Sequence, residues 1–220
     1  MKRSAFIVAL AAATALALPA FAETRSYDLP EFDRIDVSAG LKLVATAGGA
    51  QSVSVETDEG DFSDLEIEVD DGVLVVSREW NRLRWHQKKA DYTVTVSARE
   101  LRGLEASSGS ISTLTDINAR RFNLDISSGA LVVVKGQCDD CTVDISSGAN
   151  LNASEFVCDN ANIDVSSGGH GEITVTTSLI GDASSGGHVS VYGNPERVNI
   201  DKSSGGRIKV KSVSYQATRD

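Results

Sequence analysis

The sequence predicts an all-β fold: a single-stranded parallel β-helix, or β-solenoid, with coils of about 18–20 residues. The first observation is a repeat. The tripeptide Ser-Ser-Gly ends at spacings of 20, 19, 20, 18 and 19 residues, which indicates stacked copies of one unit. The unit is too short for a strand, a packed helix and two loops, and its Val, Ile and Thr content favours strands. The six glycines are Gly109, Gly129, Gly148, Gly168, Gly186 and Gly205.

The second observation is that apolar residues recur at fixed distances from these glycines. The third, fifth and eighth positions after a glycine and the fifth and seventh before it are mostly apolar, which predicts an interior column. After the glycines these residues are Val132, Val134, Leu151, Ala153, Phe156, Val189, Val191, Ile208, Val210 and Val213. Before the glycines they are Phe122, Leu124, Cys141, Val143, Ala161, Ile163, Val198 and Ile200.

The first element is a secretory signal peptide over residues 1–22. Basic Lys2 and Arg3 precede an apolar run, and small residues at Ala20 and Ala22 are typical of a cleavage site. The run from Ala5 to Leu18 is shorter than the roughly 20 residues that span a bilayer, so we expect no membrane span. The predicted location is the periplasm, the cell surface or the extracellular medium.

The mature chain is acidic. Removing residues 1–22 takes away two basic residues and no acidic one, which leaves 19 basic and 31 acidic side chains and a formal charge of −12. A protein with this charge is not expected to bind nucleic acid through a basic field. With no linker-like stretch, we expect one domain over residues 27–214.

Residues 27–105 are predicted to begin the same stack in a less regular form. The segment Ile35–Gly40 nearly repeats Ile163–Gly168, so the register should begin there. Asp71-Gly72 predicts a tight hairpin, and therefore an antiparallel excursion from one early coil. Alternating residues predict strands over Leu41–Thr46, Ser52–Thr57, Leu65–Val69, Val73–Ser77 and Tyr92–Val96.

The chain resembles a bacterial adhesin family. The signal peptide, the opening stretch Phe32–Gly40, the strand that starts at Asp71-Gly72 and the repeated Ser-Ser-Gly turns are similar, in order and number, to the head domain called GIN. This resemblance covers nearly the whole mature chain. It implies a right-handed parallel β-helix in the bacterial cell envelope, an adhesin-like role, and no cofactor.

An acidic residue stands four positions before each glycine. In a parallel stack these residues form an outward column with neighbours about 4.8 Å apart, where two carboxylates repel by roughly 1 kcal/mol in water. The column either binds cations such as calcium or is a solvated edge that blocks sideways pairing of strands. Its members are Glu105, Asp125, Asp144, Asp164, Asp182 and Asp201.

Histidines and cysteines also recur at equal offsets. His170 and His188 should be neighbours on adjacent coils with Arg207 next, where two imidazoles would need a third donor to hold a metal ion. Cys138 and Cys158 each lie ten residues before a glycine, so they should stack within disulfide distance. Cys141 would then be a buried free thiol.

Residues 78–89 differ from their surroundings, with both tryptophans and five basic residues. Trp and Arg are typical of binding interfaces, so Trp80, Arg82, Arg84 and Trp85 either bind a partner, such as a glycan or an envelope protein, or cover the hydrophobic end of the stack.

The predicted function is that of an exported, non-enzymatic cell-envelope protein that binds or scaffolds. Oligomers could form by stacking of the terminal coil. The alternative is a lyase-like enzyme that acts on polysaccharides, because some β-helices cleave acidic glycans. The short, uniform coils disfavour it, since they lack the long insertions on one face that would form a groove.

Overall fold

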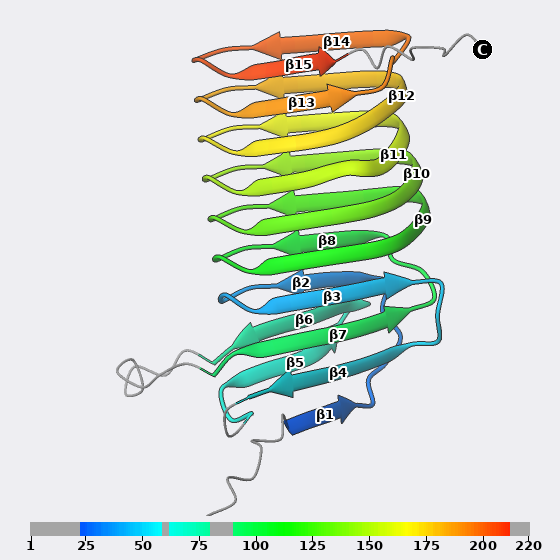
Figure 1. Cartoon of the computed structure of the whole chain (residues 1–220), viewed down its shortest axis with the longest axis vertical. Helices are drawn as coiled ribbons and strands as arrows, with labels where there is room; N and C mark the ends of the chain where they lie inside the picture. Colours follow the sequence, from blue (N-terminus) through cyan, green and yellow to red (C-terminus); the bar gives the residue numbers. More distant parts are fainter. Residues whose placement is uncertain (1–22, 59–61, 80–89, 212–220) are drawn as a thin grey trace, which may run out of the picture.

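The computed structural model describes residues 23–58, 62–79 and 90–211, and these form a right-handed β-helix (Figure 1). No helix in this part of the chain is long and apolar enough to cross a membrane. The predicted signal peptide lies outside the described residues, as do positions 212–214 of the predicted domain. The sheet begins at Glu23, which opens the first strand.

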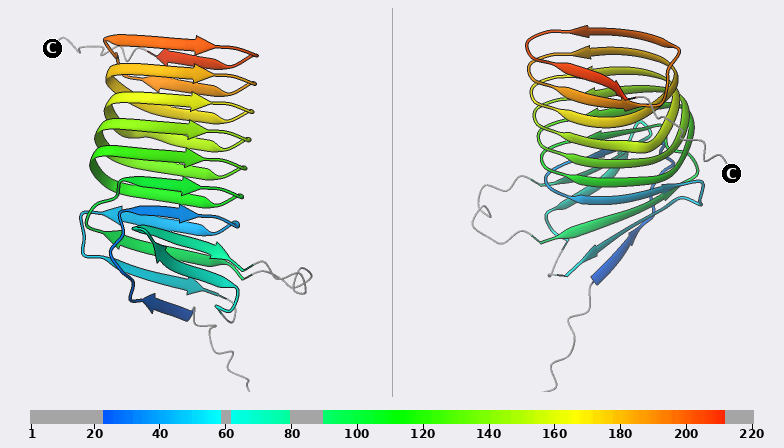
Figure 2. Two further views of the ribbon diagram at one scale, coloured as in Figure 1. Left: turned by 180° about the vertical axis from the view of Figure 1, so that it is seen from behind. Right: turned by 45° about the horizontal axis from the view of Figure 1, so that its top comes forward.

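The regular part of the stack begins with four long bent strands, β9 to β12, and ends with three short ones, β13 to β15. Each long strand runs along the front of Figure 1, curves round and returns along the back, and the second view in Figure 2 shows the stacked coils. Their parallel pairing follows the glycine repeat, since equivalent residues of successive repeats are direct neighbours. The strands are β9 (Ile111–Ile126), β10 (Leu131–Ile145), β11 (Asn150–Val165), β12 (His170–Ala183), β13 (His188–Tyr192), β14 (Arg197–Lys202) and β15 (Arg207–Lys211).

The N-terminal part is less regular, as predicted. Antiparallel β5 and β6 form the predicted hairpin, in which Asp70 pairs with Val73. Antiparallel pairing of β1 with β4 and of β4 with β7 adds two further strands to this end. The strands are β1 (Glu23–Tyr27), β2 (Arg34–Val37), β3 (Lys42–Ala47), β4 (Ser52–Thr57), β5 (Leu65–Asp70), β6 (Val73–Arg78), β7 (Tyr92–Ala98) and β8 (Gly103–Ala106).

Each Ser-Ser-Gly forms a tight turn between the back and front of the stack. In the first copy Ser108 and Gly109 have φ of +53° and +73°, and the N–H of Ser110 donates to the carbonyl of Ser107 at 3.0 Å. Positive φ at both central residues is the type I′ arrangement, for which glycine is favoured. The N–H of Gly109 donates to Ser128 of the next coil, so the ladder of hydrogen bonds continues through the turns.

The interior is one apolar column. In most coils it is formed by the residues that the offsets from the glycines predicted. Phe122 and Phe156 are fully buried and meet edge to face, with ring centroids 5.4 Å apart. The prediction for Val198 was wrong, because its side chain is 48% exposed. Val198 lies on β14, which pairs only with β12 among the described strands. At the last coil, burial therefore depends on the presence of a covering neighbour and not on the repeat itself.

Candidate functional site

The acidic column forms as predicted along the back of the stack. Strand register makes each member the direct neighbour of the next, from Glu105 through to Asp201. Asp36 on β2 pairs with Glu105 and extends the column by one residue. The sequence carries a signal for Asp36, since it stands four positions before Gly40, but that glycine follows Ser-Ala and lies outside the six Ser-Ser-Gly copies that defined the predicted column.

Burial and mutual repulsion act on this column. Burial raises the pKa of the Asp36 carboxyl. Burial, and then the charges of adjacent carboxylates, raise the pKa of Glu105 and of Asp144 above their ordinary values. At these three positions the neutral carboxyl, or one neutralised by a cation, is therefore favoured more than in an isolated side chain.

The column places carboxylates in neighbouring pairs and, among the described residues, does not surround a cation with protein ligands. Calcium takes six to eight oxygen ligands. In the part of the chain that the structure describes, the ligand atoms of the three cysteines all lie within 4.8 Å of one another, and no three carboxylates of the column come that close together. A cation at the column would thus bridge neighbouring carboxylates and retain most of its waters.

The two histidines are neighbours, as predicted. His170 pairs with His188 and His188 pairs with Arg207, all on the front of the stack. The imidazole rings are stacked with centroids 5.6 Å apart and planes 8° from parallel. Stacked rings at this distance hold their nitrogens side by side and not convergent on one ion, so the geometry favours separate roles over shared metal coordination.

The three cysteines lie together in the interior wall. Cys138 and Cys158 form a disulfide with 4.6 Å between their Cα atoms, and Cys141 is free and buried. Burial, and secondarily Asp140, raise the pKa of the Cys141 thiol to about 12. A thiol in that state is neither a ready nucleophile nor a ready metal ligand, so the described cysteines are structural.

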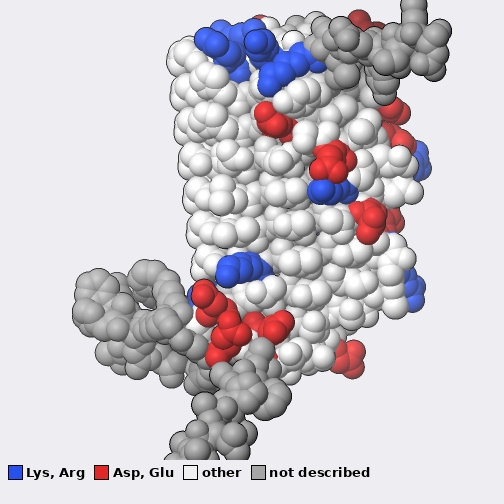
Figure 3. Space-filling model, in the orientation of Figure 1, with Lys and Arg blue, Asp and Glu red and all other residues white. Residues whose placement is uncertain are grey.

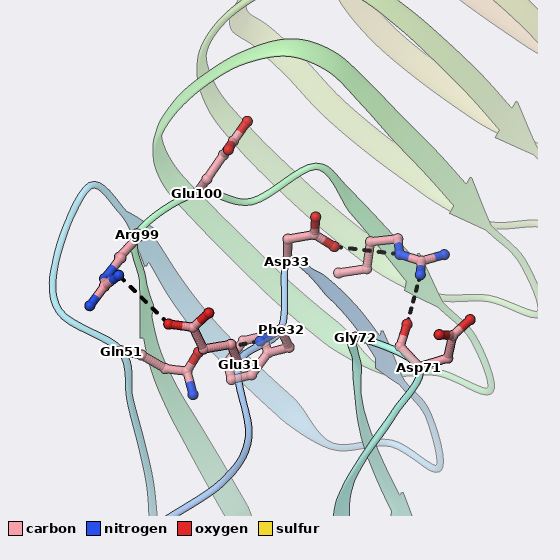
Figure 4. Close-up of a pocket in the computed structure, with 9 residues that line it drawn as sticks. Glu31, Phe32, Asp33, Gln51, Asp71, Gly72, Arg99 and Glu100 are labelled. Carbon is pink, nitrogen blue, oxygen red and sulfur yellow. Dashed lines mark hydrogen bonds and ion pairs between the residues drawn. The ribbon is translucent and has the colours of Figure 1, made fainter.

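A depression of about 650 Å³ lies at the irregular end (Figure 4). Both of its arginines are already paired: Arg34 contacts Asp33 at 3.6 Å and donates to the Asp71 carbonyl at 2.9 Å, and Arg99 contacts Glu31. These contacts fasten three connecting segments together. The lining residues are Glu31, Phe32, Asp33, Arg34, Gln51, Asp71, Gly72, Arg99 and Glu100.

Trp80, Arg82, Arg84 and Trp85 lie outside the described residues, so their predicted binding role stays a prediction. The residues on either side of this segment are tied together. The guanidinium of Arg78 contacts the Asp64 carboxylate at 3.0 Å and donates to the Ala90 carbonyl at 2.6 Å. The hydroxyl of Tyr92 donates to the same carboxylate. This network fixes the two points at which the segment leaves and rejoins the stack.

Comparison with known proteins agrees with this architecture. The family described as "Putative auto-transporter adhesin, head GIN domain" matches residues 31–195. None of the curated proteins matches the chain. A solved structure described as a putative adhesin from Bacteroides fragilis has a TM-score of 0.63 at 15% identity, covering 87% of this chain and 97% of that one.

Two further solved structures share the fold. A putative adhesin from Parabacteroides merdae has a TM-score of 0.54 at 15% identity, with 88% of this chain and 96% of that chain covered. One from Parabacteroides distasonis has a TM-score of 0.53 at 15% identity, with 89% and 98% covered. Since the family match spans most of the chain and includes five of its six Ser-Ser-Gly copies, this chain belongs to the family described as "Putative auto-transporter adhesin, head GIN domain".

Proposed function

We propose that this chain is an exported, non-enzymatic protein of the bacterial cell envelope that binds or scaffolds through the outer surface of its β-helix. The observation that carries the proposal is the regular stack itself. Outward side chains of successive coils stand in direct register, so they form continuous columns at a spacing of about 4.8 Å. Such columns suit an extended or repetitive ligand better than a single small substrate.

The arrangement of the potential nucleophiles supports a non-enzymatic role. A catalytic serine needs a base within hydrogen-bond reach. The described histidines His170 and His188 instead bond through Nδ1 to the backbone carbonyls of Gly168 and Gly186. The turn serines are equivalent copies along the stack, and none of them is set apart by a base.

The location is tested by fractionation. Cells that express the full chain should release the mature protein from the periplasm or the surface, and a variant without residues 1–22 should stay in the cytoplasm. Retention of the full chain in the cytoplasm would contradict the proposal.

Binding is tested with the mature protein on bacterial cells and on a glycan array. The parent should adhere. If the predicted role of Trp80, Arg82, Arg84 and Trp85 holds, the double variant Trp85→Ala/Arg84→Ala should adhere more weakly while its melting temperature stays close to that of the parent. A large loss of stability would show that this segment covers the core instead. Shortening of a polysaccharide by the parent would favour the lyase-like alternative.

A further inference from the structure

We propose that the C-terminal end of the front face is a binding site for an anionic saccharide, that is, a glycan bearing carboxylate or sulfate groups. This inference rests on the proposed binding function and assigns it a site and a ligand class. The site is a depression of about 370 Å³ that crosses β11, β12, β13 and β15. Its outward polar lining consists of Asn150, Asn152, His170, Glu172, His188, Ser190, Arg207 and Lys209.

The strand register builds this site from two adjacent outward columns. The first column carries Asn150, His170, His188 and Arg207 on successive coils. The second carries Asn152, Glu172, Ser190 and Lys209 in the same order. Two parallel rows of hydrogen-bonding groups therefore lie across the strands, and both rows end in a cation on the last strand.

The charge at this end contrasts with the rest of an acidic protein. Figure 3 shows that basic side chains gather over β15 at the C-terminal end of the front face. Arg207 and Lys209 are exposed and have no ion pair within the described residues. An unpaired guanidinium next to an unpaired ammonium on a chain of net charge −10 is a site for an anionic group.

The acidic residue in the lining does not cancel these cations. Glu172 accepts a hydrogen bond from the Tyr192 hydroxyl at 3.2 Å, and the Lys211 ammonium lies 4.0 Å from the same carboxylate. Lys211 also donates to the Tyr192 hydroxyl at 3.1 Å. Glu172 therefore has its own counter-charge, which leaves Arg207 and Lys209 available to a ligand.

The imidazole rings of His170 and His188 are oriented so that one nitrogen of each can contact a ligand. Each Nδ1 lies 2.7–2.8 Å from a carbonyl oxygen, which can only accept, so Nδ1 carries the proton and Nε2 is left for a ligand. A neutral ring presents Nε2 as an acceptor for a sugar hydroxyl.

The shape and lining favour a saccharide over a lipid. The volume is within the range of small-molecule sites. The apolar residues of the lining, Leu151 and Val189, are only 2% and 3% exposed, so the site presents no apolar side chain on which an acyl chain could pack. Amide, hydroxyl and imidazole groups spaced along the depression match the hydroxyls of sugar rings, with Arg207 and Lys209 at the anionic substituent.

The test is binding of the mature protein to polygalacturonate, dextran sulfate and neutral dextran, measured by calorimetry. Arg207→Gln/Lys209→Gln should weaken binding of the two anionic polymers by about tenfold or more. The matched control is Arg197→Gln/Lys202→Gln, which removes two exposed cations from β14 of the same coil and should change binding by less than about threefold. These thresholds correspond to about 1.4 and 0.7 kcal/mol.

A further double variant tests the imidazoles. His170→Ala/His188→Ala removes both Nε2 atoms that face a ligand, so at constant pH it should weaken binding of the two anionic polymers by about threefold or more. Unchanged binding in this variant would exclude the histidines from the site.

Several outcomes would overturn the inference. These are no binding of either anionic polymer by the parent, equal losses in the β15 and β14 variants, or preferential binding of vesicles of phosphatidylglycerol and phosphatidylcholine. Failure of the wider function is distinguishable. If the parent adheres to cells and Arg207→Gln/Lys209→Gln adheres equally, the site is wrong and the binding function stands. If the parent does not adhere at all, the function itself fails.

Discussion

Neutralising one residue in the middle of the acidic column should stabilise the protein. Asp144 lies between Asp125 and Asp164, each one strand away. At about 4.8 Å, each pair of charges repels by about 0.9 kcal/mol in water. Salt with a Debye length of about 8 Å roughly halves that value. The variant Asp144→Asn keeps the shape and removes both repulsions, so the free energy of unfolding should rise by about 1 kcal/mol in physiological salt.

The assay is urea and thermal unfolding of the mature protein, and the expected rise in melting temperature is about 2–4 °C. The matched control is Glu196→Gln, which removes an exposed negative charge outside the column. The gain in Asp144→Asn should grow as salt is lowered. Equal effects of the two variants, or a loss of stability in Asp144→Asn, would refute the repulsion argument.

The pH dependence has a definite sign. The pKa values of Asp36, Glu105 and Asp144 are raised in the folded state, so the folded protein holds these protons more tightly than the unfolded chain. Their contribution therefore destabilises the fold above the raised pKa values and disappears as the pH falls through them. Stability should rise from neutral pH toward mildly acidic pH, and Asp144→Asn should show a smaller rise.

Calcium separates the two interpretations of the column. If cations bridge neighbouring carboxylates, millimolar calcium should raise the melting temperature of the parent, and Asp144→Asn/Asp164→Asn should lose that response. If calcium has no effect and the double variant is simply more stable than the parent, the column is a solvated acidic edge.

Three further predictions concern stability and are checked by urea unfolding. Replacing Cys138 and Cys158 by alanine opens a cross-link with a sequence separation of 20 and should cost about 3 kcal/mol; a non-reduced digest that lacked this linkage would contradict the assigned register. Gly136→Ala should cost about 3 kcal/mol or more, because the new Cβ would lie 2.1 Å from a backbone oxygen at φ +133°; Gly148→Ala, with open space around it, should cost only about 1–2 kcal/mol. Ser112→Ala should gain up to about 1 kcal/mol, because the buried hydroxyl has no hydrogen-bond partner; a loss would imply a partner for it.

Near-identical repeats made the regular coils predictable from sequence. Offsets from each glycine gave the neighbours of Asp144 and of His188, because a parallel stack converts equal offsets into direct contact. The same arithmetic paired Cys138 with Cys158. The Asp71-Gly72 hairpin was also predictable, because its turn chemistry is local.

Only the tertiary structure decided the features that depend on distant segments or on the ends of the stack. Pairing of β1 with β4 and of β4 with β7 joins strands without a shared repeat, so no offset marks it. Val198 has the interior pattern yet is exposed, because burial requires a neighbouring coil as well as an apolar side chain. The cationic end of the front face likewise arises because two parallel columns both end in a cation on β15. Charges distant in sequence combine only when strand register places them on one surface.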